Sequence, residues 1–352
     1  MNHDLLFEIG IEELPASYVQ PALDQLERGV RAGLAELRLS CGDIATFGTP
    51  RRLAVLVTDV AARQQDFDEE AMGPAAKVAF DAEGAPTKAL IGFCAGKGVD
   101  VASVRRVETP KGEYVAVTVH HAGRDAAEVL PGLLGPLAGK LQYPKSMRWD
   151  GGDYRAGRPV RWLVALLGDA VLPVQAFGLT AGRETFGHRF LHPGAVSIAT
   201  PRTYLEALLQ ARVITDHAAR TRTVREQIDA QATAAGGRIV ADDELVDINT
   251  QLVEWPTSFT GHFDAKYLDL PREVIVTALR EHQRFFAVES ADGTLLGHFI
   301  TVRNGDDAGV ATVRKGNEDV LVARLDDARF YWDTDLKHKP ADLVEKLSGV
   351  VW

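Results

Sequence analysis

Apolar residues recur along most of the chain at the spacings typical of strands and helices. Residues 5–11 and 52–60 are short, nearly continuous apolar runs, which predicts two buried strands. Between them, apolar residues three and four positions apart predict a helix, and Pro15 and Pro21 place its regular start near residue 20. This helical stripe consists of Val19, Leu23, Leu26, Val30, Leu34 and Leu37. The chain is therefore expected to open as strand, helix and strand.

Glycine and proline interrupt the pattern between about residues 64 and 142. The pattern there predicts a short helix, two strands joined by a turn, and a closing apolar helix that tolerates two prolines. These elements are expected at 86–97, 103–108, 113–119 and 129–141. We interpret the segment as a small module inserted into the first domain or attached to it.

Strand and helix patterns alternate in the remainder of the chain. Two strands within 160–179 flank Gly168-Asp169, and a second hairpin has its turn at 291–293. The hairpin strands are expected at 284–289 and 295–302. Helices are expected at 201–213, 216–235, 241–254, after Pro271, and at 317–332.

The length of 352 residues exceeds what one hydrophobic core usually supports, so several domains are expected. We predict an α+β fold with several domains, in which helices pack on mixed sheets. The predicted parts are an N-terminal α/β segment at 1–63, the α+β module at 64–142, a β-rich segment at 143–200 that returns to the first domain, and an α+β domain at 201–352.

The charge balance changes the picture of possible partners. The net charge is −10, whereas a protein that coats nucleic acid is usually basic. Any RNA binding must therefore come from a local basic patch or from other parts of an assembly. No apolar run is long enough to span a bilayer, and residues 1–4 lack the basic start of a signal peptide.

The two cysteines, Cys41 and Cys94, make neither a disulfide framework nor a zinc knuckle. Both are expected to be packed thiols, which fits a reducing cytoplasm. The glycines at 92, 96 and 98 resemble a phosphate loop only superficially. Three residues separate the first two glycines where the loop needs four, and Gly98 occupies the place of the magnesium-binding hydroxyl.

Residues 145–162 form a basic stretch within this acidic chain. Its five basic residues outnumber Asp150 and Asp153 and give a net charge of +3. The basic residues are Lys145, Arg148, Arg155, Arg158 and Arg161, interleaved with Trp149, Tyr154 and Trp162. Positive charge with aromatic faces predicts RNA contact. The alternative is that the arginines pair with nearby acids and the aromatic rings, Trp162 above all, are core.

Two further segments combine histidine with arginine. Residues 185–193 hold His188, Arg189 and His192 between glycine and proline bends, which favours a structural or RNA-facing loop over a metal or catalytic site. In 281–286, His282 continues an apolar helical face and is expected to be a core histidine. Arg284 follows at the helix end and could meet a carboxylate or a phosphate.

The segment 315–333 combines a glycine near its start with a helical stripe. The predicted buried residues are Val320, Leu321, Leu325, Ala328 and Trp332. Arg324 with Asp327, and Asp326 with Arg329, can pair along the helix surface, although each pair contributes only ~0.2–0.5 kcal/mol. The sharper interpretation is an arginine-rich face that docks another subunit or RNA through Arg314, Arg324 and Arg329.

Four stretches, 7–15, 144–149, 281–286 and 315–333, together resemble the beta subunit of the bacterial two-subunit glycyl-tRNA synthetase. The resemblance runs from residue 5 to the last residue. It implies the N-terminal half of a subunit that grips tRNA(Gly) within a cytoplasmic α2β2 assembly. The apolar end at 347–352 fits a chain that continues, in that family into an HD-type and an anticodon-binding domain.

The resemblance assigns the class II catalytic core, and with it ATP and magnesium, to the alpha subunit. Residues 145–147 match only part of the class I lysine loop, and the class II arginine motifs have no counterpart here. We therefore expect no catalytic residue, no metal and no cofactor bound by this chain. The region around 281–286 is expected to be similar to the editing-type domain of the phenylalanyl-tRNA synthetase beta subunit.

Two alternatives remain open. A hydrolytic editing module acting on mischarged tRNA would need a pocket with a placed water, for which His188, His192 or His282 are the candidates. A pure assembly scaffold would contact no RNA. The RNA-contact hypothesis, by contrast, assigns binding to the basic stretch together with Arg189 and Arg284.

Overall fold

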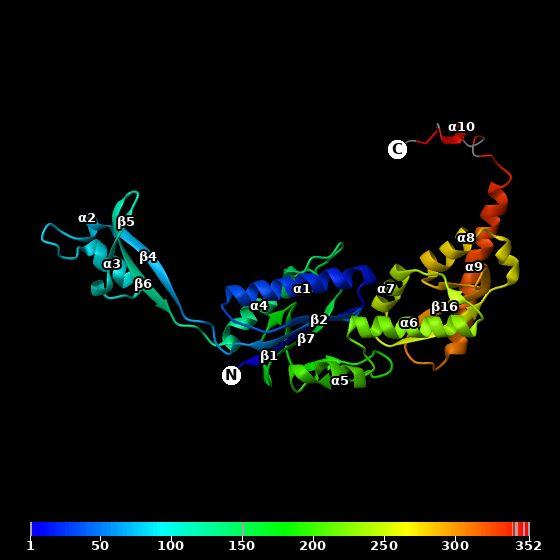
Figure 1. Ribbon diagram of the computed structural model, residues 1–352, viewed down its shortest axis with the longest axis horizontal. Helices are drawn as coiled ribbons and strands as arrows, with labels where there is room; N and C mark the ends of the chain where they lie inside the picture. Colours follow the sequence, from blue (N-terminus) through cyan, green and yellow to red (C-terminus); the bar gives the residue numbers. More distant parts are fainter. Residues whose placement is uncertain (1, 150, 340, 342–343, 348, 351–352) are drawn as a thin grey trace.

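The computed structural model describes residues 2–149, 151–339, 341, 344–347 and 349–350. Figure 1 shows an elongated molecule with an arm, a central body and a C-terminal unit in a row. Antiparallel sheets and packed helices make up the three parts, which confirms the expected α+β fold with several domains. No helix in the described part of the chain has the length and apolar character needed to cross a membrane.

The central body is built on a five-stranded antiparallel sheet in the order β2-β3-β1-β7-β8. Its strands are β1 (His3–Ile11), β2 (Ile44–Thr49), β3 (Arg52–Val60), β7 (Val160–Leu167) and β8 (Ala170–Val171). The first two strands expected from the sequence are β1 and β3. Strand β1 lies at the centre of the sheet, between β3 and β7.

Helices cover both faces of this sheet, which explains why β1 is apolar along nearly its whole length. Side chains alternate between faces along a strand. Leu5, Phe7 and Ile9 therefore pack against helices α1 (Ala16–Glu36) and α4 (Ala126–Lys140). Leu6 points the other way and packs with α5 (Tyr204–Gln210). Strand β1 thus belongs to two hydrophobic cores.

Gly10 opens space for a large side chain on the α5 side of the sheet. A Cβ atom at Gly10 would lie 1.9 Å from the indole ring of Trp162, its cross-strand partner. The missing side chain therefore lets the indole lie flat against β1. Trp162 is buried there, as expected.

The arm projects from the body on two long strands (Figure 1). Its sheet has the order β4-β6-β5, and its helices pack on a small core around Leu90, Cys94 and Val115. Its elements are β4 (Phe67–Ala75), α2 (Ala76–Ala79), α3 (Lys88–Lys97), the 3-10 turn η1 (Val101–Ser103), β5 (Arg105–Thr109) and β6 (Gly112–His121). Helix α4, which the sequence pattern assigns to this module, packs instead on the body. The domain boundaries at residues 63, 142 and 200 stay predictions.

The C-terminal unit is a second three-layered structure. Its sheet has the order β13-β15-β16-β14, with α6 and α7 on one face and α8 and α9 on the other. The strands are β13 (Arg238–Ile239), β14 (Pro256–His262), β15 (Phe286–Glu289) and β16 (Leu295–Asn304). The helices are α6 (His217–Ala234), α7 (Asp243–Leu252), α8 (Arg272–Thr277) and α9 (Val310–Asp335).

Short elements complete the chain. Between β8 and α5 lie β9 (Gln175–Ala176), β10 (Leu179–Thr180), β11 (Glu184–Phe186), β12 (Ala195–Ser197) and the 3-10 turn η2 (Pro201–Thr203). Around α8 lie the 3-10 turn η3 (Ala265–Asp269) and the π-helical turn η4 (Ala278–His282). Helix α10 (Val344–Leu347) follows α9, whereas residues 348, 351 and 352 of the apolar end fall outside the described residues.

Several expectations about the helices and cysteines are wrong. Helix α1 begins at Ala16, before Pro21, which the helix accommodates in its second turn. Helix α9 begins at Val310 and not near 317, because Gly309 adopts the left-handed conformation that starts it. Cys94 is buried, as expected, but Cys41 is exposed.

Candidate functional site

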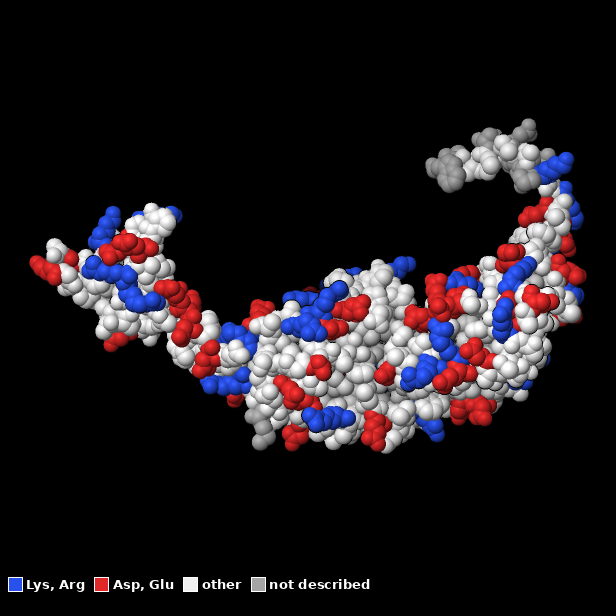
Figure 2. Space-filling view, viewed as in Figure 1, with Lys and Arg blue, Asp and Glu red and all other residues white. Residues whose placement is uncertain are grey.

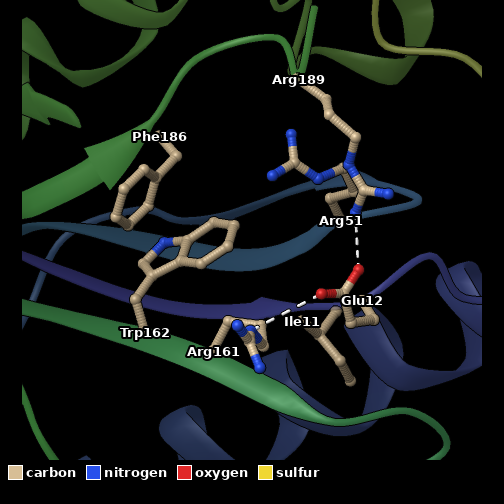
Figure 3. Close-up of a pocket in the computed structure, with 7 residues that line it drawn as sticks. All are labelled: Ile11, Glu12, Arg51, Arg161, Trp162, Phe186 and Arg189. Atoms are coloured by element: carbon tan, nitrogen blue, oxygen red, sulfur yellow. Dashed lines mark hydrogen bonds and ion pairs between the residues drawn. The ribbon is translucent and has the colours of Figure 1, made fainter. Parts of the chain in front are cut away.

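A cavity of about 340 Å³ opens where three strands of the body sheet meet a loop from β11. Figure 3 shows its lining residues, with three guanidinium groups on one side and two aromatic rings on the other. The lining residues are Ile11, Glu12, Arg51, Arg161, Trp162, Phe186 and Arg189.

The antiparallel sheet brings these residues together. The C-terminal end of β1 lies beside the first residues of both β3 and β7, because each neighbour runs in the opposite direction. The main-chain nitrogen of Ile11 donates to Arg51 O at 2.9 Å, and that of Glu12 donates to Pro159 O at 2.9 Å. These bonds fix the backbone at the mouth of the cavity.

Glu12 is the negative charge within the cavity lining. Its carboxylate lies 3.6 Å from Arg161 Nε and 2.5 Å from Arg189 Nη2, and Figure 3 shows it between the two groups. Arg189 also pairs with Glu13 at 3.7 Å. Glu12, Arg161 and Arg189 are all exposed or half-exposed, so solvent weakens these pairs.

Arg51 is buried, unlike the other two arginines of the cavity. Its Nη1 donates to Gly187 O at 3.2 Å and lies 3.4 Å from Glu254 Oε2. Its Nε is buried and has no hydrogen-bond partner among the described residues. One edge of this guanidinium is thus held by protein, and the group still carries unused donor capacity.

The aromatic wall is fixed from behind. Trp162 and Phe186 meet edge to face, with ring centroids 4.9 Å apart. The indole Nε1 of Trp162 donates to Glu8 Oε1, and the Thr185 hydroxyl donates to the same oxygen at 2.6 Å. Because Glu8 is fully buried, it holds both partners in place.

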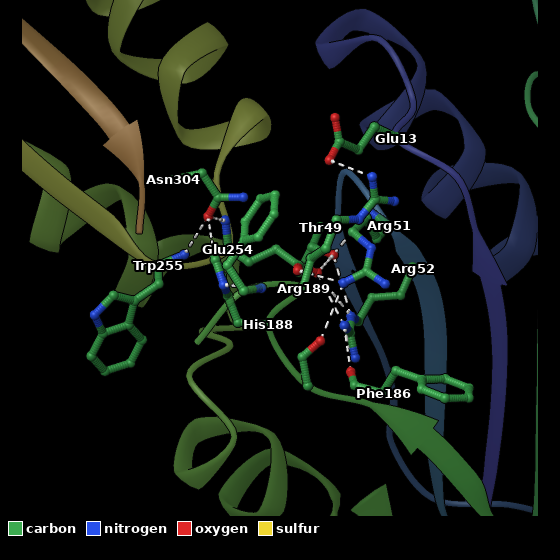
Figure 4. Close-up of polar contacts among 12 residues, drawn as sticks. Glu13, Thr49, Arg51, Arg52, Phe186, His188, Arg189, Glu254, Trp255 and Asn304 are labelled. Atoms are coloured by element: carbon green, nitrogen blue, oxygen red, sulfur yellow. Dashed lines mark hydrogen bonds and ion pairs between the residues drawn. The ribbon is translucent and has the colours of Figure 1, made fainter. Parts of the chain in front are cut away.

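Glu254 connects the body to the C-terminal unit. It lies between α7 and β14, and Figure 4 shows its side chain reaching Thr49, Arg51 and Arg52 of the body. Arg52 Nη2 donates to Glu254 Oε1 at 3.0 Å, and the Thr49 hydroxyl donates to the same oxygen at 2.7 Å. All the charges of this cluster are buried.

The environment holds Glu254 in its charged form. Burial alone would raise the pKa of this carboxyl, but the charges of Arg52 and Arg51 and the hydrogen bond from Thr49 outweigh that effect. The pKa of Glu254 is therefore below its ordinary value of 4.5. Burial likewise acts to lower the pKa of Arg52, but Glu254 and Glu8 more than compensate and raise it.

Two further contacts join the same units. Arg220 of α6 donates to Gly48 O of β2 at 2.8 Å and to Thr250 O of α7 at 2.9 Å. His188 Nε2 lies 2.9 Å from Asn304 Oδ1, the oxygen that also accepts from the backbone nitrogens of Glu254 and Trp255 (Figure 4). The cavity therefore lies beside a rigid junction and not on a free loop.

His188 has both ring nitrogens engaged. Its Nδ1 accepts from the backbone nitrogens of Phe190 and Leu191 at 3.3 and 3.2 Å, so Nε2 carries the proton donated to Asn304. The ring is fully buried. This arrangement supports the structural interpretation of the loop. His192 follows in the same turn, and its backbone nitrogen donates to His188 O at 2.9 Å.

Only two of the predicted RNA-contact residues lie at the cavity, namely Arg161 and Arg189. The other basic residues of the predicted stretch lie on the loop 144–158, which is held by the antiparallel pairing of Met147 with Ala156. These residues are Lys145, Arg148, Arg155 and Arg158. All four are exposed or half-exposed.

The partners of these loop residues differ. Arg148 lies 3.9 Å from Asp153. Arg155 donates to Ser146 O at 2.7 Å, and Arg158 to Gly157 O at 3.1 Å. Among the described residues, Lys145, Arg155 and Arg158 have no carboxylate within ion-pair distance, although Asp150 falls outside the described residues.

The remaining predicted residues lie in the C-terminal unit, away from the cavity lining. Arg284 has a φ of 59° and lies 3.5 Å from Glu281. Arg314 is half-buried with its guanidinium carbon 5.9 Å from the centre of the Phe259 ring. Arg324 lines a surface groove of about 460 Å³ with Tyr331.

The predictions for α9 and His282 need correction. Leu321 and Leu325 are buried, but Val320 and Trp332 are exposed, because only one narrow side of α9 packs on the sheet. Asp326 accepts from the Tyr267 hydroxyl at 2.5 Å and Arg329 lies 3.4 Å from Asp269, so both reach η3 in place of the expected pairing with each other. His282 is exposed in the groove and is not a core residue.

Sequence reasoning missed Glu12, Arg51, Arg52 and Glu254. A signal existed for the arginines, since two adjacent basic residues precede an apolar strand that begins in a buried sheet. No local pattern pairs them with Glu254, which lies about two hundred residues along the chain. Within the described residues, no group of three or more His, Cys, Asp or Glu side chains could hold a metal ion.

Comparison with known proteins places the chain in a family. The family model described as "Glycyl-tRNA synthetase beta subunit" matches residues 5–352. The chain is 45% identical to the glycine–tRNA ligase beta subunit of Moorella thermoacetica, 45% identical to that of Myxococcus xanthus and 43% identical to that of Ligilactobacillus salivarius. Each alignment covers 100% of this chain and 50 or 51% of the relative.

The chain thus spans about half the length of the curated relatives it matches. The match extends over every part described above, namely the arm, the body with its cavity, and the C-terminal unit. The chain therefore belongs to the glycyl-tRNA synthetase beta subunit family.

Proposed function

We propose that this chain supports the ATP-dependent attachment of glycine to tRNA(Gly) as the N-terminal half of the beta subunit. In this proposal it binds and positions tRNA and assembles with the alpha subunit in an α2β2 enzyme in the cytoplasm. The alpha subunit makes the bond. ATP and magnesium are used by that subunit.

The observation that carries the RNA-binding part is the set of unpaired charges on the loop 144–158. Lys145, Arg155 and Arg158 have no carboxylate partner among the described residues. Elsewhere many exposed arginines are paired, such as Arg31 with Glu27 and Arg225 with Asp243. Figure 2 shows acidic and basic side chains mixed over one face of the molecule. Unpaired basic groups on an acidic protein are the ones free to meet phosphates.

Positioning is a sufficient role for a subunit without catalytic groups. Holding tRNA in a fixed orientation near the activated amino acid converts a bimolecular encounter into an oriented one. The buried junction around Glu254 supports this role, because a rigid connection between body and C-terminal unit keeps RNA contacts on the two parts at fixed separation.

The assembly part rests on a different surface. Phe330 and Tyr331 of α9 are exposed, and Arg324 lies beside Tyr331 in the groove. Exposed aromatic residues next to arginine are typical of protein interfaces. We propose that this face of α9, with Arg324 as its charged member, contacts the alpha subunit. Of the three histidines considered for the editing alternative, His188 is fully engaged in structural bonds, and His192 and His282 are exposed and do not line the cavity beside His188.

The test of RNA binding replaces Lys145, Arg155 and Arg158 with glutamate in the full-length subunit assembled with the alpha subunit. The affinity for tRNA(Gly) should fall, and the dependence of log K on log salt should become shallower by about 0.7–0.9 for each phosphate that the loop no longer binds. A control with the same charge change replaces Arg31, Arg124 and Arg225, each paired with a carboxylate. Equal affinities and slopes for the two variants would refute the proposal for this loop.

A further inference from the structure

We propose that the arginine-lined cavity binds an unpaired, phosphate-bearing nucleotide of RNA, and that Glu12 occupies the position of the phosphate until RNA displaces it. This inference rests on the proposed function, because it specifies which kind of RNA group one site takes. It concerns a different surface from the loop 144–158.

Positive charges surround the carboxylate of Glu12 in the cavity. Arg161 and Arg189 approach the same carboxylate from two segments, β7 and the loop after β11, at 3.6 and 2.5 Å. Arg51 provides a third guanidinium in the lining. Three guanidinium groups converge on a space in which Glu12 is the acidic residue. An incoming phosphate offers more acceptor oxygens to these donors than one carboxylate does.

Arg51 places a buried, preorganised guanidinium group in the cavity lining. A buried guanidinium loses little side-chain freedom on binding, because Gly187 and Glu254 already hold one part of it. Its buried Nε has no partner among the described residues, although buried donors are normally satisfied. The cavity lining therefore contains a preorganised positive charge, which an incoming anion would meet. Arginine rather than lysine also suits the paired oxygens of a phosphate.

The aromatic wall of Trp162 and Phe186 favours an anion that carries a nucleobase over a simple inorganic anion. Phe186 is half-buried, and it lies beside the edge of Trp162 within the cavity lining. A base can pack against such a wall, and base–aromatic contact is a general means of binding single strands. The volume of about 340 Å³ lies within the ~300–1,000 Å³ usual for ligand pockets. It therefore accommodates one nucleotide but not a duplex.

The surroundings favour RNA over a free nucleotide. Arg161 and Arg189 are exposed at the rim, so a strand can enter and leave past them. Arg161 is separated from the loop 144–158 by only two residues, so a strand that leaves the cavity past Arg161 can continue toward the basic residues of that loop. Continuity with further phosphate-binding groups benefits a polynucleotide and gives no advantage to a mononucleotide.

The test uses two matched pairs of variants in the full-length subunit assembled with the alpha subunit. Glu12→Gln is compared with Glu27→Gln, since these side chains are 37% and 38% exposed and each pairs with arginine. Arg161→Ala is compared with Arg31→Ala, since these are 62% and 60% exposed. The two variants of a pair change the net charge by the same amount, but only the first of them, at Glu12 or Arg161, lies in the cavity. The probes are a fluorescent single-stranded RNA pentanucleotide and AMP.

We expect Glu12→Gln to tighten pentanucleotide binding by about threefold to tenfold and Arg161→Ala to weaken it by about tenfold. The two outer controls should stay within about twofold of the parent. A gain of affinity is the decisive readout, because damage to the fold cannot produce it. AMP should bind much more weakly than the pentanucleotide.

Several results would overturn the inference. Absence of pentanucleotide binding by the parent, or equal effects of Glu12→Gln and Glu27→Gln, would remove the cavity as a phosphate site. AMP binding as tightly as the pentanucleotide would overturn RNA as the ligand. If tRNA(Gly) still bound in those cases with a strong dependence on salt, the proposed function would remain valid and only the inference about the cavity would be wrong. If the parent enzyme did not bind tRNA(Gly) at all, both the inference about the cavity and the proposed function would be wrong.

Discussion

Glu254 shows how a single buried residue can determine the geometry of a large molecule. Its carboxylate lies among Thr49, Arg51 and Arg52, and the surrounding charges keep it ionised without solvent. A buried ion pair contributes little net stability compared with apolar packing, yet it is costly to break. Its value here is specificity, because only one relative placement of the two units satisfies all these groups.

We predict that Glu254→Gln lowers the free energy of unfolding by about 3–5 kcal/mol, because it leaves Arg52 buried beside a neutral group. The measurement is urea denaturation followed by fluorescence and circular dichroism. Glu289→Gln is the control, since the partners of Glu289, Arg238 and Arg272, are partly exposed. An equal loss in both variants would contradict the special role of the junction.

The same variant tests how protein stability depends on pH in the acidic range. The pKa of Glu254 is lower in the folded protein than its ordinary value of 4.5, so its stabilising effect is complete above pH 4.5. The effect is lost as the pH falls below 4.5 toward the folded-state pKa. The parent should therefore lose more stability in this range than Glu254→Gln does. Parallel curves for the two proteins would show that Glu254 does not titrate with folding.

Gly10 allows a second test at the scale of one residue. A methyl group at Gly10 would lie 1.9 Å from the Trp162 ring, whereas one at Gly92 in α3 would meet nothing within 4 Å. Gly10→Ala should destabilise the protein by about 1–3 kcal/mol through overpacking. Gly92→Ala should be neutral or stabilising by up to about 1 kcal/mol, since alanine favours helix. Equal midpoints of thermal unfolding would contradict the close packing of β1 on Trp162.

At the scale of elements, the sequence predicts best those segments whose surroundings are uniform. Strands β1 and β3 are buried on both faces, so both are nearly continuous apolar runs that are easily recognised. Strand β4 is not predicted, because its residues Phe67–Ala75 are mostly acidic or exposed. It forms the stalk of the arm, where little core is available to impose a hydrophobic pattern.

Helix α9 differs from expectation for the opposite reason. Its apolar stripe predicts burial along the whole helix, but only Leu321 and Leu325 are fully covered. Figure 1 shows the later turns of α9 extending beyond the sheet of its unit. Asp326 and Arg329, which are expected to pair along its surface, instead contact Tyr267 and Asp269 of η3. A periodic pattern indicates a helix but not how far its partner extends.

The arm should be removable as one piece. Its two stalk strands meet the body where Gln64 N donates to Arg124 O at 2.9 Å, so the chain ends left by a deletion lie close together. Replacing residues 66–122 with a short Gly-Ser linker should leave the thermal unfolding midpoint of the body nearly unchanged, because the arm has its own core. Aggregation or loss of cooperative unfolding would show that the body depends on the arm.

At the scale of the whole molecule, the resemblance identifies the family, while the site depends on tertiary structure. The four stretches that suggest the family are local in sequence and are recognised directly. The cavity, by contrast, combines residues from β1, β3, β7 and the loop after β11, and sequence spacing does not reveal such convergence. Of its charged residues only Arg161 and Arg189 are predicted from the sequence. The expected likeness to an editing-type domain stays a prediction.

The two RNA-facing surfaces that we propose have different physical characters. The loop 144–158 offers charges without carboxylate partners among the described residues, which suits tight, salt-dependent contact with a phosphate backbone. The cavity offers paired charges, a buried arginine and an aromatic wall, which suits one selected nucleotide. Both lie on the body, and the junction at Glu254 fixes them relative to the C-terminal unit.

The most direct measurement compares two activities of the assembled enzyme that carries Lys145→Glu, Arg155→Glu and Arg158→Glu. One is glycine activation, measured by ATP–pyrophosphate exchange without tRNA, and the other is glycylation of tRNA(Gly). We predict unchanged exchange and a KM for tRNA raised at least about tenfold, because the replaced side chains serve tRNA and not the adenylate. Reduced exchange, or an unchanged KM for tRNA, would contradict the claim that this chain handles tRNA for a reaction performed elsewhere.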